Sequence, residues 1–509
     1  MAEIGPEDAP RRAAADALRA HLVELFHCDV DLPALDFALS ALTEQSRFGT
    51  TDDVLEWLRG LNGTRHFLVE RKPLADLERW CFHPDTGDIE HDSGGFFAIR
   101  GLSVQTNVGR VTEWSQPIID QAEIGLLGIL TRRIDGVLHL LLQAKAEPGN
   151  INTFQLSPSV QATRSNFTRV HGGAKTQFLE YFMEDSGQRT LVDQLQSEQG
   201  ARFFHKRNRN TIVRLRDDQE IETGPLHRWV TLGQLAALSK HDNIVNMDTR
   251  SVISCISYDM SAAGIQVSKD ELEARLESSL LFDSPSETSA DLLLSAQRTA
   301  RPHCSSDELV HWLTTRKFDT LLRQRIVPLK SVGEWRHEDG VIQHPTGRYF
   351  RVLGVRVEAQ GREVQKWEQP IIEQMSAGLV GFLARRIDGV LHFLVQAKVE
   401  CGNMDILELA PTVQCITSNY DLHDMPPHAD GFLHPTGRTT LVDALQSEEG
   451  GRFFHEANRN VVQLLGDSPA PDPHPSYAWL TLYQLKEFVR YNNYVNVEAR
   501  SLLACLGLS

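Results

Sequence analysis

The sequence predicts a mixed α+β protein in which one domain occurs twice. Three blocks, residues 114–119, 132–139 and 143–145, return 253 positions later at 367–372, 385–392 and 396–398. Two later blocks, 195–198 and 202–205, return at an offset of 250. Such a period is far longer than the roughly 20–50 residues of solenoid repeats, so it indicates a duplicated domain. Within each copy, strand patterns precede helical patterns without βαβ alternation, which is typical of an α+β domain.

The bulk composition narrows the function classes. The chain has 509 residues, 41% of them hydrophobic, and a formal net charge of −17. This charge argues against nucleic acid as a partner, because phosphate backbones require a basic surface. The seven cysteines are scattered and form no C-x-x-C pair, which indicates free thiols in a reducing cytoplasm. No apolar run approaches the roughly 20 residues of a membrane span, and the first residues do not resemble a signal peptide, so we expect no membrane partner.

The chain divides into four predicted segments. Residues 1–50 form a helical lead-in, 51–256 the first repeat, 257–305 a connector with a helix near 270–280, and 306–509 the second repeat. Each repeat opens with a hydroxyl residue followed by acids, at 51–53 and 306–308. Side-chain oxygens of this kind accept from the free N–H groups of a helix start, so a helix is predicted at both positions.

The same elements are predicted in both repeats. Strands are expected at 96–104 and 349–357. Hairpins follow, because Asp135-Gly136 and Asp388-Gly389 each lie between two apolar runs. These runs cover 125–130 with 137–142 in the first copy and 378–383 with 390–395 in the second. The remaining patterns predict helices at 191–200 and 441–450, and further helices at 232–238 and 482–489.

Cofactor and metal motifs are missing. The sequence has no G-x-G-x-x-G, no G-x-x-x-x-G-K-[ST], no H-E-x-x-H and no close His/Cys cluster. We therefore predict neither a cofactor nor a metal. A polar block at 196–210, matched at 446–460, carries arginines and asparagines that would suit an anion pocket. The alternative is that Glu198 and Arg202, four residues apart, simply pair on a helix surface.

A comparison of the two copies favours the first as the host of a diphosphate. Lys206 and Arg207 correspond to Glu456 and Ala457, and Arg164 corresponds to Thr417.

Other shared positions stay open. The block 156–161, matched at 409–414, is either a ligand loop or a structural turn. Trp114 and Trp367 either stack on a base or belong to the core. Lys145 and Lys398 are either functional or solvated.

Several blocks go beyond these general patterns. Residues 114–119, 143–150, 155–163, 196–200, 206–210, 229–235 and 243–248 resemble the NDP-hexose 2,3-dehydratases, and the resemblance extends from about residue 51 to 507. It implies a duplicated Nudix-like fold, a homodimer, dTDP-sugar binding, and one catalytic and one vestigial pocket per subunit. The implied substrate is dTDP-4-keto-6-deoxy-D-glucose and the product dTDP-3,4-diketo-2,6-dideoxy-D-glucose. A downstream 3-ketoreductase is expected. The metal-binding box of Nudix hydrolases is absent from this sequence.

The implied lyase chemistry needs a base, an acid and an oxyanion partner but no redox cofactor, because the C4 ketone of the substrate accepts the electrons. Glu198 is the first candidate for the base and His205 the second, and Lys145 or Lys206 would assist the leaving hydroxyl or the enolate. The substrate-binding candidates of the first repeat are Trp114, Gln116, Gln155, Gln161, Arg164, Arg202, Arg207, Asn208 and Arg209. The second-site candidates are Trp367, Gln414, Arg452, Asn458 and Arg459. Two alternatives remain: a Nudix-type NDP-sugar diphosphatase, and a non-catalytic sugar-nucleotide binding protein.

Overall fold

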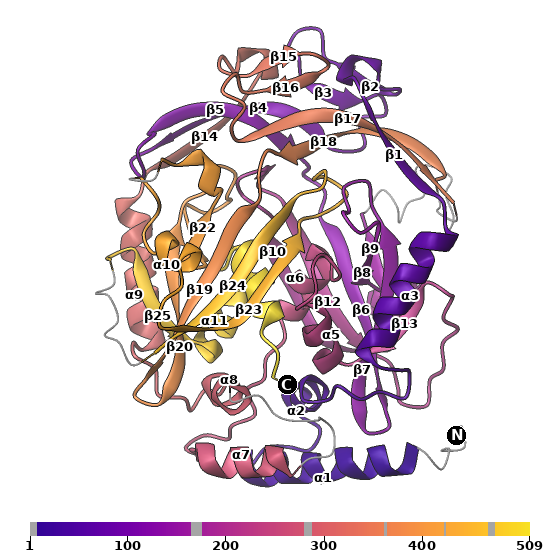
Figure 1. Cartoon of the computed structure of the whole chain (residues 1–509), viewed down its shortest axis with the longest axis vertical. Coiled ribbons are helices and arrows are strands. Elements are labelled where there is room, and N and C mark those ends of the chain that lie inside the picture. Colours follow the sequence, from indigo (N-terminus) through magenta and orange to yellow (C-terminus); the bar gives the residue numbers. More distant parts are fainter. Residues whose placement is uncertain are drawn as a thin grey trace.

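Two seven-stranded mixed sheets, one from each repeat, lie side by side in the middle of the molecule (Figure 1). The computed structural model describes residues 8–163, 176–278, 288–360, 364–421, 424–466 and 474–508. The first sheet contains β6 (Gly125–Ile134), β7 (Val137–Ala146), β8 (Phe154–Pro158), β9 (Val160–Ala162), β10 (Arg189–Ser197), β12 (Arg207–Arg214) and β13 (His227–Val230). The second contains β19 (Gly378–Ile387), β20 (Val390–Lys398), β21 (Glu408–Ala410), β22 (Val413–Cys415), β23 (Arg438–Ser447), β24 (Ala457–Leu465) and β25 (Tyr477–Thr481). Their strand orders correspond, β10-β12-β6-β7-β13 and β23-β24-β19-β20-β25, so the predicted duplicated α+β architecture is confirmed.

Two smaller sheets cover one end of the molecule, and each borrows a strand from the other repeat (Figure 1). One consists of β2 (Trp80–Phe82), β3 (Ile89–His91), β4 (Ala98–Thr106), β5 (Glu113–Asp120), β11 (Phe203–Phe204) and the borrowed β14 (Leu322–Val327). The other consists of β15 (Arg336–Glu338), β16 (Val341–Gln343), β17 (Phe350–Ala359), β18 (Lys366–Gln374) and the borrowed β1 (Phe67–Lys72). Strand β1 pairs antiparallel with β17, and β14 pairs antiparallel with β4. The repeats are therefore intertwined.

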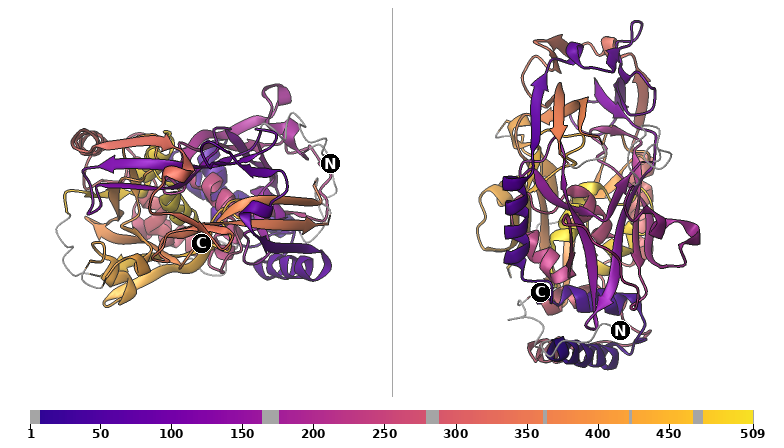
Figure 2. Two further views of the ribbon diagram at one scale, coloured as in Figure 1. Left: turned by 90° about the horizontal axis from the view of Figure 1, so that it is seen from above. Right: turned by 90° about the vertical axis from the view of Figure 1, so that its right-hand side faces the viewer.

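Helices surround the two large sheets. Those of the first half are α1 (Asp8–Phe26), α2 (Pro33–Ala41), α3 (Thr51–Thr64), α5 (Leu232–Leu238) and α6 (Met247–Ser254). Those of the second half are α7 (Lys269–Glu277), α8 (Ser289–Ser295), α9 (Ser306–Asp319), α10 (Ala429–Leu433), α11 (Leu482–Val489) and α12 (Val497–Cys505). Single 3-10 turns lie at Leu74–Asp76, Leu179–Phe182, Glu184–Ser186, Leu329–Ser331 and Thr417–Asn419. The side view shows α1 at the end opposite the two small sheets (Figure 2). Within the described residues, no helix is both long and apolar enough to span a membrane.

Helices α2 and α8 show that the duplication extends into the lead-in and the connector. The Ser40 hydroxyl donates to the Leu138 carbonyl at 2.6 Å and accepts from the Leu232 amide at 2.9 Å. Ser295 makes the equivalent bonds to Leu391, at 2.6 Å, and Leu482, at 2.8 Å. Each serine ties its helix to the large sheet and to the following helix of its own repeat.

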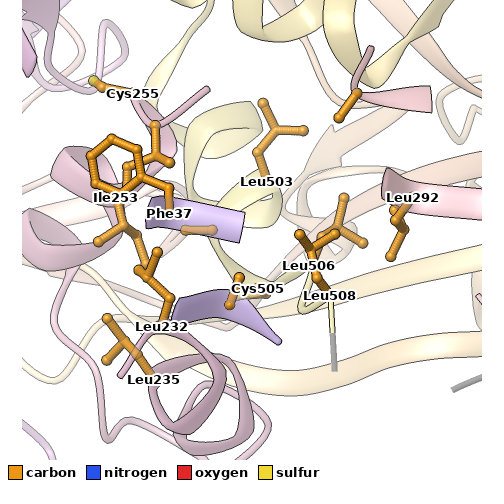
Figure 3. Close-up of a cluster of buried hydrophobic side chains, with 14 of the residues drawn as sticks. Phe37, Leu232, Leu235, Ile253, Cys255, Leu292, Leu503, Cys505, Leu506 and Leu508 are labelled. Carbon is orange, nitrogen blue, oxygen red and sulfur yellow. The ribbon is translucent and has the colours of Figure 1, made fainter. Parts of the chain in front are cut away.

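A large cluster of buried hydrophobic residues extends across both repeats. In Figure 3, Phe37, Leu232 and Ile253 of the first half lie near Leu503 and Leu506 of the second. Burial of one such leucine or phenylalanine side chain contributes about 1.5–3 kcal/mol. The two halves therefore share much of the apolar burial that stabilises each of them.

Most of the predicted elements are confirmed. The strands near 96–104 and 349–357, both hairpins, the helices of the lead-in, and the helices at 232–238 and 482–489 lie where expected. Helices α3 and α9 begin with capping boxes whose N-caps are Thr50 and Ser305.

The predicted helices at 191–200 and 441–450 are wrong, because these segments are strands β10 and β23. A bulge between Thr190 and Val192, repeated between Thr440 and Val442, interrupts the alternation of inward and outward side chains. The interrupted pattern resembles helical spacing. The helix-surface interpretation of Glu198 and Arg202 is therefore also wrong.

Candidate active site

A cavity of about 990 Å³ lies where the large sheet of the first repeat meets the two small sheets. From the first repeat it is lined by Gln143 and Lys145 of β7, Gln161 of β9, and Asn208 of β12, among others. The second repeat contributes Trp367 and Gln369 of β18 and the turn that carries Glu449, Gly451 and Arg452. Because β1 and β14 are exchanged, the cavity is built from both halves of the chain.

Cations and acids alternate on the wall formed by the first repeat. Lys145 Nζ lies 3.0 Å from Glu147 Oε1, and Gln161 donates to the same oxygen at 3.2 Å. The Lys206 ammonium donates to the backbone carbonyl of Glu123. Burial lowers the pKa of Lys206, although Glu198 and Glu449 act in the opposite direction.

Two further carboxylates with unusual titration face this wall. Burial raises the pKa of Glu449, and the nearby Glu147 adds to the effect. Burial raises the pKa of Asp248 well above its ordinary value, and repulsion by Glu449 is the next cause. Displaced pKa values of this kind, grouped in one cavity, are typical of sites that move protons.

Close backbone contacts between the repeats hold the turn with Glu449 in place. The Gly149 amide donates to the Gly450 carbonyl at 2.7 Å, and the His455 amide donates to the Gly149 carbonyl at 2.9 Å. A Cβ atom at Gly149 would lie 1.6 Å from the Phe453 carbonyl oxygen, so only glycine fits there. The buried Arg250 of α6 also donates to the Ser447 carbonyl at 2.6 Å. These bonds fix the turn relative to Asp248, which lies on the same helix as Arg250.

Basic side chains line the outer part of the cavity. Arg65 and His66 follow α3, and Arg356 and Lys366 lie on the adjacent strands β17 and β18. Arg356 and Lys366 are exposed, with 45% and 67% of their side chains accessible. Both bind Glu358, at 2.6 and 3.0 Å. We name these four residues the cationic rim.

The family of the chain follows from sequence comparison. A profile of NDP-hexose 2,3-dehydratases matches residues 51–256 and 306–506. The chain belongs to the NDP-hexose 2,3-dehydratase family.

Curated relatives agree with this assignment. A dTDP-4-dehydro-6-deoxy-alpha-D-glucopyranose 2,3-dehydratase of Saccharopolyspora spinosa is 42% identical over 473 residues, which cover 92% of this chain and 94% of that protein. A protein of the same name from Amycolatopsis orientalis is 42% identical over 478 residues, covering 92% and 93%. The predicted relation to Nudix folds is tested by neither comparison and stays a prediction.

The second repeat of this dehydratase-family chain holds a counterpart of the site with a different charge pattern. Lys398, Glu400 and Glu498 correspond to Lys145, Glu147 and Asp248. Two acids are new: Glu456 replaces Lys206 and Glu408 replaces Gln155. Burial raises the pKa of Glu456 to about 8 and that of Glu408 to about 7.

The rim also differs between the repeats. The equivalents of Arg65, His66, Arg356 and Lys366 are Thr320, Leu321, Ser103 and Glu113. The second site therefore has a less positive mouth and a more acidic interior than the first.

Six of the residues predicted from sequence meet in the first cavity. Lys145, Gln161, Lys206 and Asn208 line it as members of the first repeat. Trp367 and Arg452, which were expected in the second site, line it too. Arg452 donates to Gln121 at 3.2 and 3.3 Å and lies over the Phe97 ring at 4.2 Å.

Trp114, Gln116 and Arg202 are the first-repeat equivalents of residues that line the first cavity, and they lie on the side of the second repeat. Gln116 donates to the Ala201 carbonyl at 3.1 Å, and Trp114 packs in a cluster with Cys401. Burial raises the pKa of Glu400, Glu448 and Glu456, and the positive charge of Arg202 acts in the opposite direction. The strand exchange thus reverses the expected assignment of these residues.

Glu198 and His205, the two candidate bases, do not line the cavity. Glu198 is buried behind it and accepts from Asn208 at 2.7 Å, and burial followed by repulsion from Glu449 raises its pKa to about 7. His205 stacks on Phe204, and its Nε2 lies 3.2 Å from Gln324. Gln155 is also fully buried and accepts from Ser447 at 2.8 Å.

Arg207 and Arg209 lie on the face of β12 opposite Asn208, because side chains alternate along a strand. Arg209 pairs with Asp193 at 2.7 Å, and Arg459 pairs in the same way with Asp443 at 2.6 Å. Both pairs are about 40% exposed and lie outside the cavity lining. Arg164 falls outside the residues that the structure describes.

The second-site candidates Gln414 and Asn458 bind residues of their own, second repeat. Gln414 donates to Glu400 at 2.9 Å and Asn458 donates to Glu448 at 2.6 Å.

Sequence reasoning missed Glu147, Asp248, Glu449 and the four rim residues. Glu147 and Asp248 were inside the motifs that carry the family resemblance and could have been found there. Glu449 and the rim come together only through contacts between the repeats, which no local pattern reveals.

Proposed function

We propose that this chain removes the C2 hydroxyl of dTDP-4-keto-6-deoxy-D-glucose to give dTDP-3,4-diketo-2,6-dideoxy-D-glucose. The supporting observation is the composite cavity, which combines a cationic rim with the buried carboxyls of Glu449 and Asp248 and the buried amine of Lys206, all three of displaced pKa. The curated relatives, named 2,3-dehydratases of this sugar nucleotide, support the choice of substrate.

The diphosphate would bind at the rim and the sugar would lie deeper. Arginine is well suited to phosphate oxygens because its planar donors can bind two of them at once. Arg65 and Arg356 supply such groups from two different repeats. The aromatic side chains Trp80, Phe97 and Trp367, which also line the cavity, offer apolar surfaces to the rest of the nucleotide.

The reaction itself is an elimination next to a ketone. A base takes the proton from C3, and the electrons of that bond pass into the C4 ketone as an enolate. The enolate then expels the C2 hydroxyl as water with the help of an acid, and the resulting enol becomes the 3,4-diketone. Lys145 and Lys206 both line the cavity and would supply the positive charge that stabilises the enolate and the departing hydroxyl in such a mechanism.

The deciding experiment is an incubation of the purified chain with dTDP-4-keto-6-deoxyglucose, with and without EDTA, followed by mass spectrometry of the nucleotides. A product lighter by one water in both samples is expected. Release of dTMP that depends on Mg²⁺ would support the diphosphatase alternative. Tight dTDP binding without turnover would support a binding protein.

Three wider features belong to the same proposal. We expect a homodimer, which light scattering after gel filtration would test. A 3-ketoreductase would act on the product, because dehydration leaves a ketone at C3. The seven free cysteines support a cytoplasmic location.

A further inference from the structure

Three pairs of interior positions differ in charge between the two sites. Lys206 of the first site is matched by Glu456 in the second, Glu449 by Gln199, and Gln155 by Glu408. Lys145 and Lys398 are both lysines, and Glu147 and Glu400 are both glutamates. Lys206 and Glu449 line the first cavity, whereas Gln155 does not, and the two interact because Glu449 opposes the lowering of the Lys206 pKa.

Glu449 and Asp248 both line this cavity, and neither side chain accepts a hydrogen bond from the residues that the structure describes, whereas Glu147 binds both Lys145 and Gln161. The copy comparison separates the two, because Asp248 is matched by the acid Glu498 in the second repeat and Glu449 is matched by the uncharged Gln199. Glu449 follows β23 at the turn whose backbone is fixed against Gly149. It therefore reaches into the cavity from a rigid position contributed by the second repeat.

We propose that Glu449 of the second repeat is the base that takes the C3 proton, and that Lys206 of the first repeat is the acid that protonates the departing C2 hydroxyl. This inference rests on the function proposed above. Each residue alone would lack its partner if the two repeats were separated.

The proton balance closes with these two groups. Glu449 takes the C3 proton, and the C3–H electrons form the C3–C4 double bond of the enolate. When the C4 ketone reforms, a C2–C3 double bond forms and the C2–O bond breaks. The oxygen leaves with its own hydrogen and one from the Lys206 ammonium, as water. The enol oxygen at C3 then returns a proton to Lys206, and Glu449 returns its proton to C2.

The surroundings of both groups favour these roles. Glu147 disfavours a negative charge on Glu449, and Asp248 and Glu449 repel each other when both are charged, whereas Arg452, Lys206 and Lys145 favour the charge on Glu449. Burial raises the pKa of Glu449 and lowers that of Lys206. The two values move toward neutral pH, where a base and an acid transfer protons most efficiently.

The test uses Glu449→Gln and Lys206→Gln, with Glu456→Gln as the matched control in the second repeat. Glutamine at the position of Glu449 has a natural precedent in Gln199, so the fold should accept it. Each variant is incubated with substrate in D₂O, and deuterium in the sugar is read by mass spectrometry. Affinity for dTDP is measured in parallel to show that the cavity is intact.

Glu449→Gln is expected to lower kcat by about 10²–10⁴-fold and to abolish deuterium uptake at C3, with dTDP affinity within about threefold of the parent. Lys206→Gln should still take up deuterium at C3 but lose water slowly. Glu456→Gln should keep its turnover.

A Glu449→Gln variant that exchanges C3 and turns over normally would overturn the assignment while leaving the dehydratase function intact. Loss of C3 exchange in Lys206→Gln would overturn the division of roles. An unmodified enzyme that does not dehydrate the sugar would instead refute the proposed function.

Discussion

Replacement of Arg356 by glutamine should weaken substrate binding without affecting the chemical step. Arg356 lies at the mouth of the cavity on β17, about half exposed, with its Nη2 atom 2.6 Å from Glu358. An exposed ion pair contributes at most about 1 kcal/mol, because water screens it. Loss of the rim contact should therefore raise KM about fivefold, since 1.4 kcal/mol corresponds to tenfold. The value of kcat should stay the same.

Two arginines outside the cavity provide matched controls. Arg459 lies 2.6 Å from Asp443 and is 39% exposed, and Arg209 lies 2.7 Å from Asp193 and is 40% exposed. Arg209→Gln and Arg459→Gln should leave KM within twofold of the parent. The assay is the steady-state rate of dehydration at several substrate concentrations.

Ionic strength supplies an independent measurement. The screening length falls from about 30 Å at 0.01 M salt to about 8 Å at 0.15 M. The KM of the parent enzyme should therefore rise with salt more steeply than that of Arg356→Gln. If Arg209→Gln raises KM and Arg356→Gln does not, the diphosphate binds at the edge of the large sheet and the role of the rim is refuted.

Three further perturbations test other parts of the structure. The plot of kcat/KM against pH should be bell-shaped. Its acid limb should lie above the ordinary carboxyl pKa, because the pKa of Glu449 is raised, and its alkaline limb should lie below the ordinary lysine pKa, because the pKa of Lys206 is lowered. A profile that is flat from pH 5 to 10 would contradict both roles. Ser40→Ala and Ser295→Ala should each lower the free energy of unfolding, measured in urea, by about 2 kcal/mol, because each change removes the hydroxyl that binds a buried carbonyl and a buried amide. Losses below about 0.5 kcal/mol would show that these hydrogen bonds contribute little to stability. Burial raises the pKa of Glu456 to about 8, so the unfolded chain loses this proton at a lower pH than the folded chain does. The resulting penalty on the folded state grows as the pH rises from about 4.5 to about 8 and persists above that. Glu456→Gln should therefore raise Tm more at pH 7.5 than at pH 5, and an equal shift at both values would contradict this pKa.

The sequence was sufficient for elements whose signals are local. The Asp135-Gly136 turn lies between two apolar runs, and the structure places β6 and β7 there. The acids after Thr50 and Ser305 marked the starts of α3 and α9. Strand β10 was missed because its bulge shifts the side-chain alternation by one residue, and that shift depends on pairing with β12.

The composition of the site depended on information that is not local. Lys145 and Asn208 were recognised because both copies of the repeat carry the same residue, and Lys206 was recognised because the second copy carries an acid in its place. Arg452 was assigned to the wrong side, because the blocks were grouped by repeat. Pairing of β1 with β17 is decided by the three-dimensional arrangement of segments almost 300 residues apart, and a pattern within one repeat contains no trace of it.

The exchange of β1 and β14 has a consequence for how such a chain could arise. A protein made of one repeat would leave its first strand without a sheet, and it could satisfy that strand only by associating with an identical molecule. In such a pair both cavities would be the same, because one gene would encode both walls. Joining the two copies in one polypeptide removes this constraint. Lysine at 206 and glutamate at 456 then become independent choices, and one cavity can specialise while the other diverges.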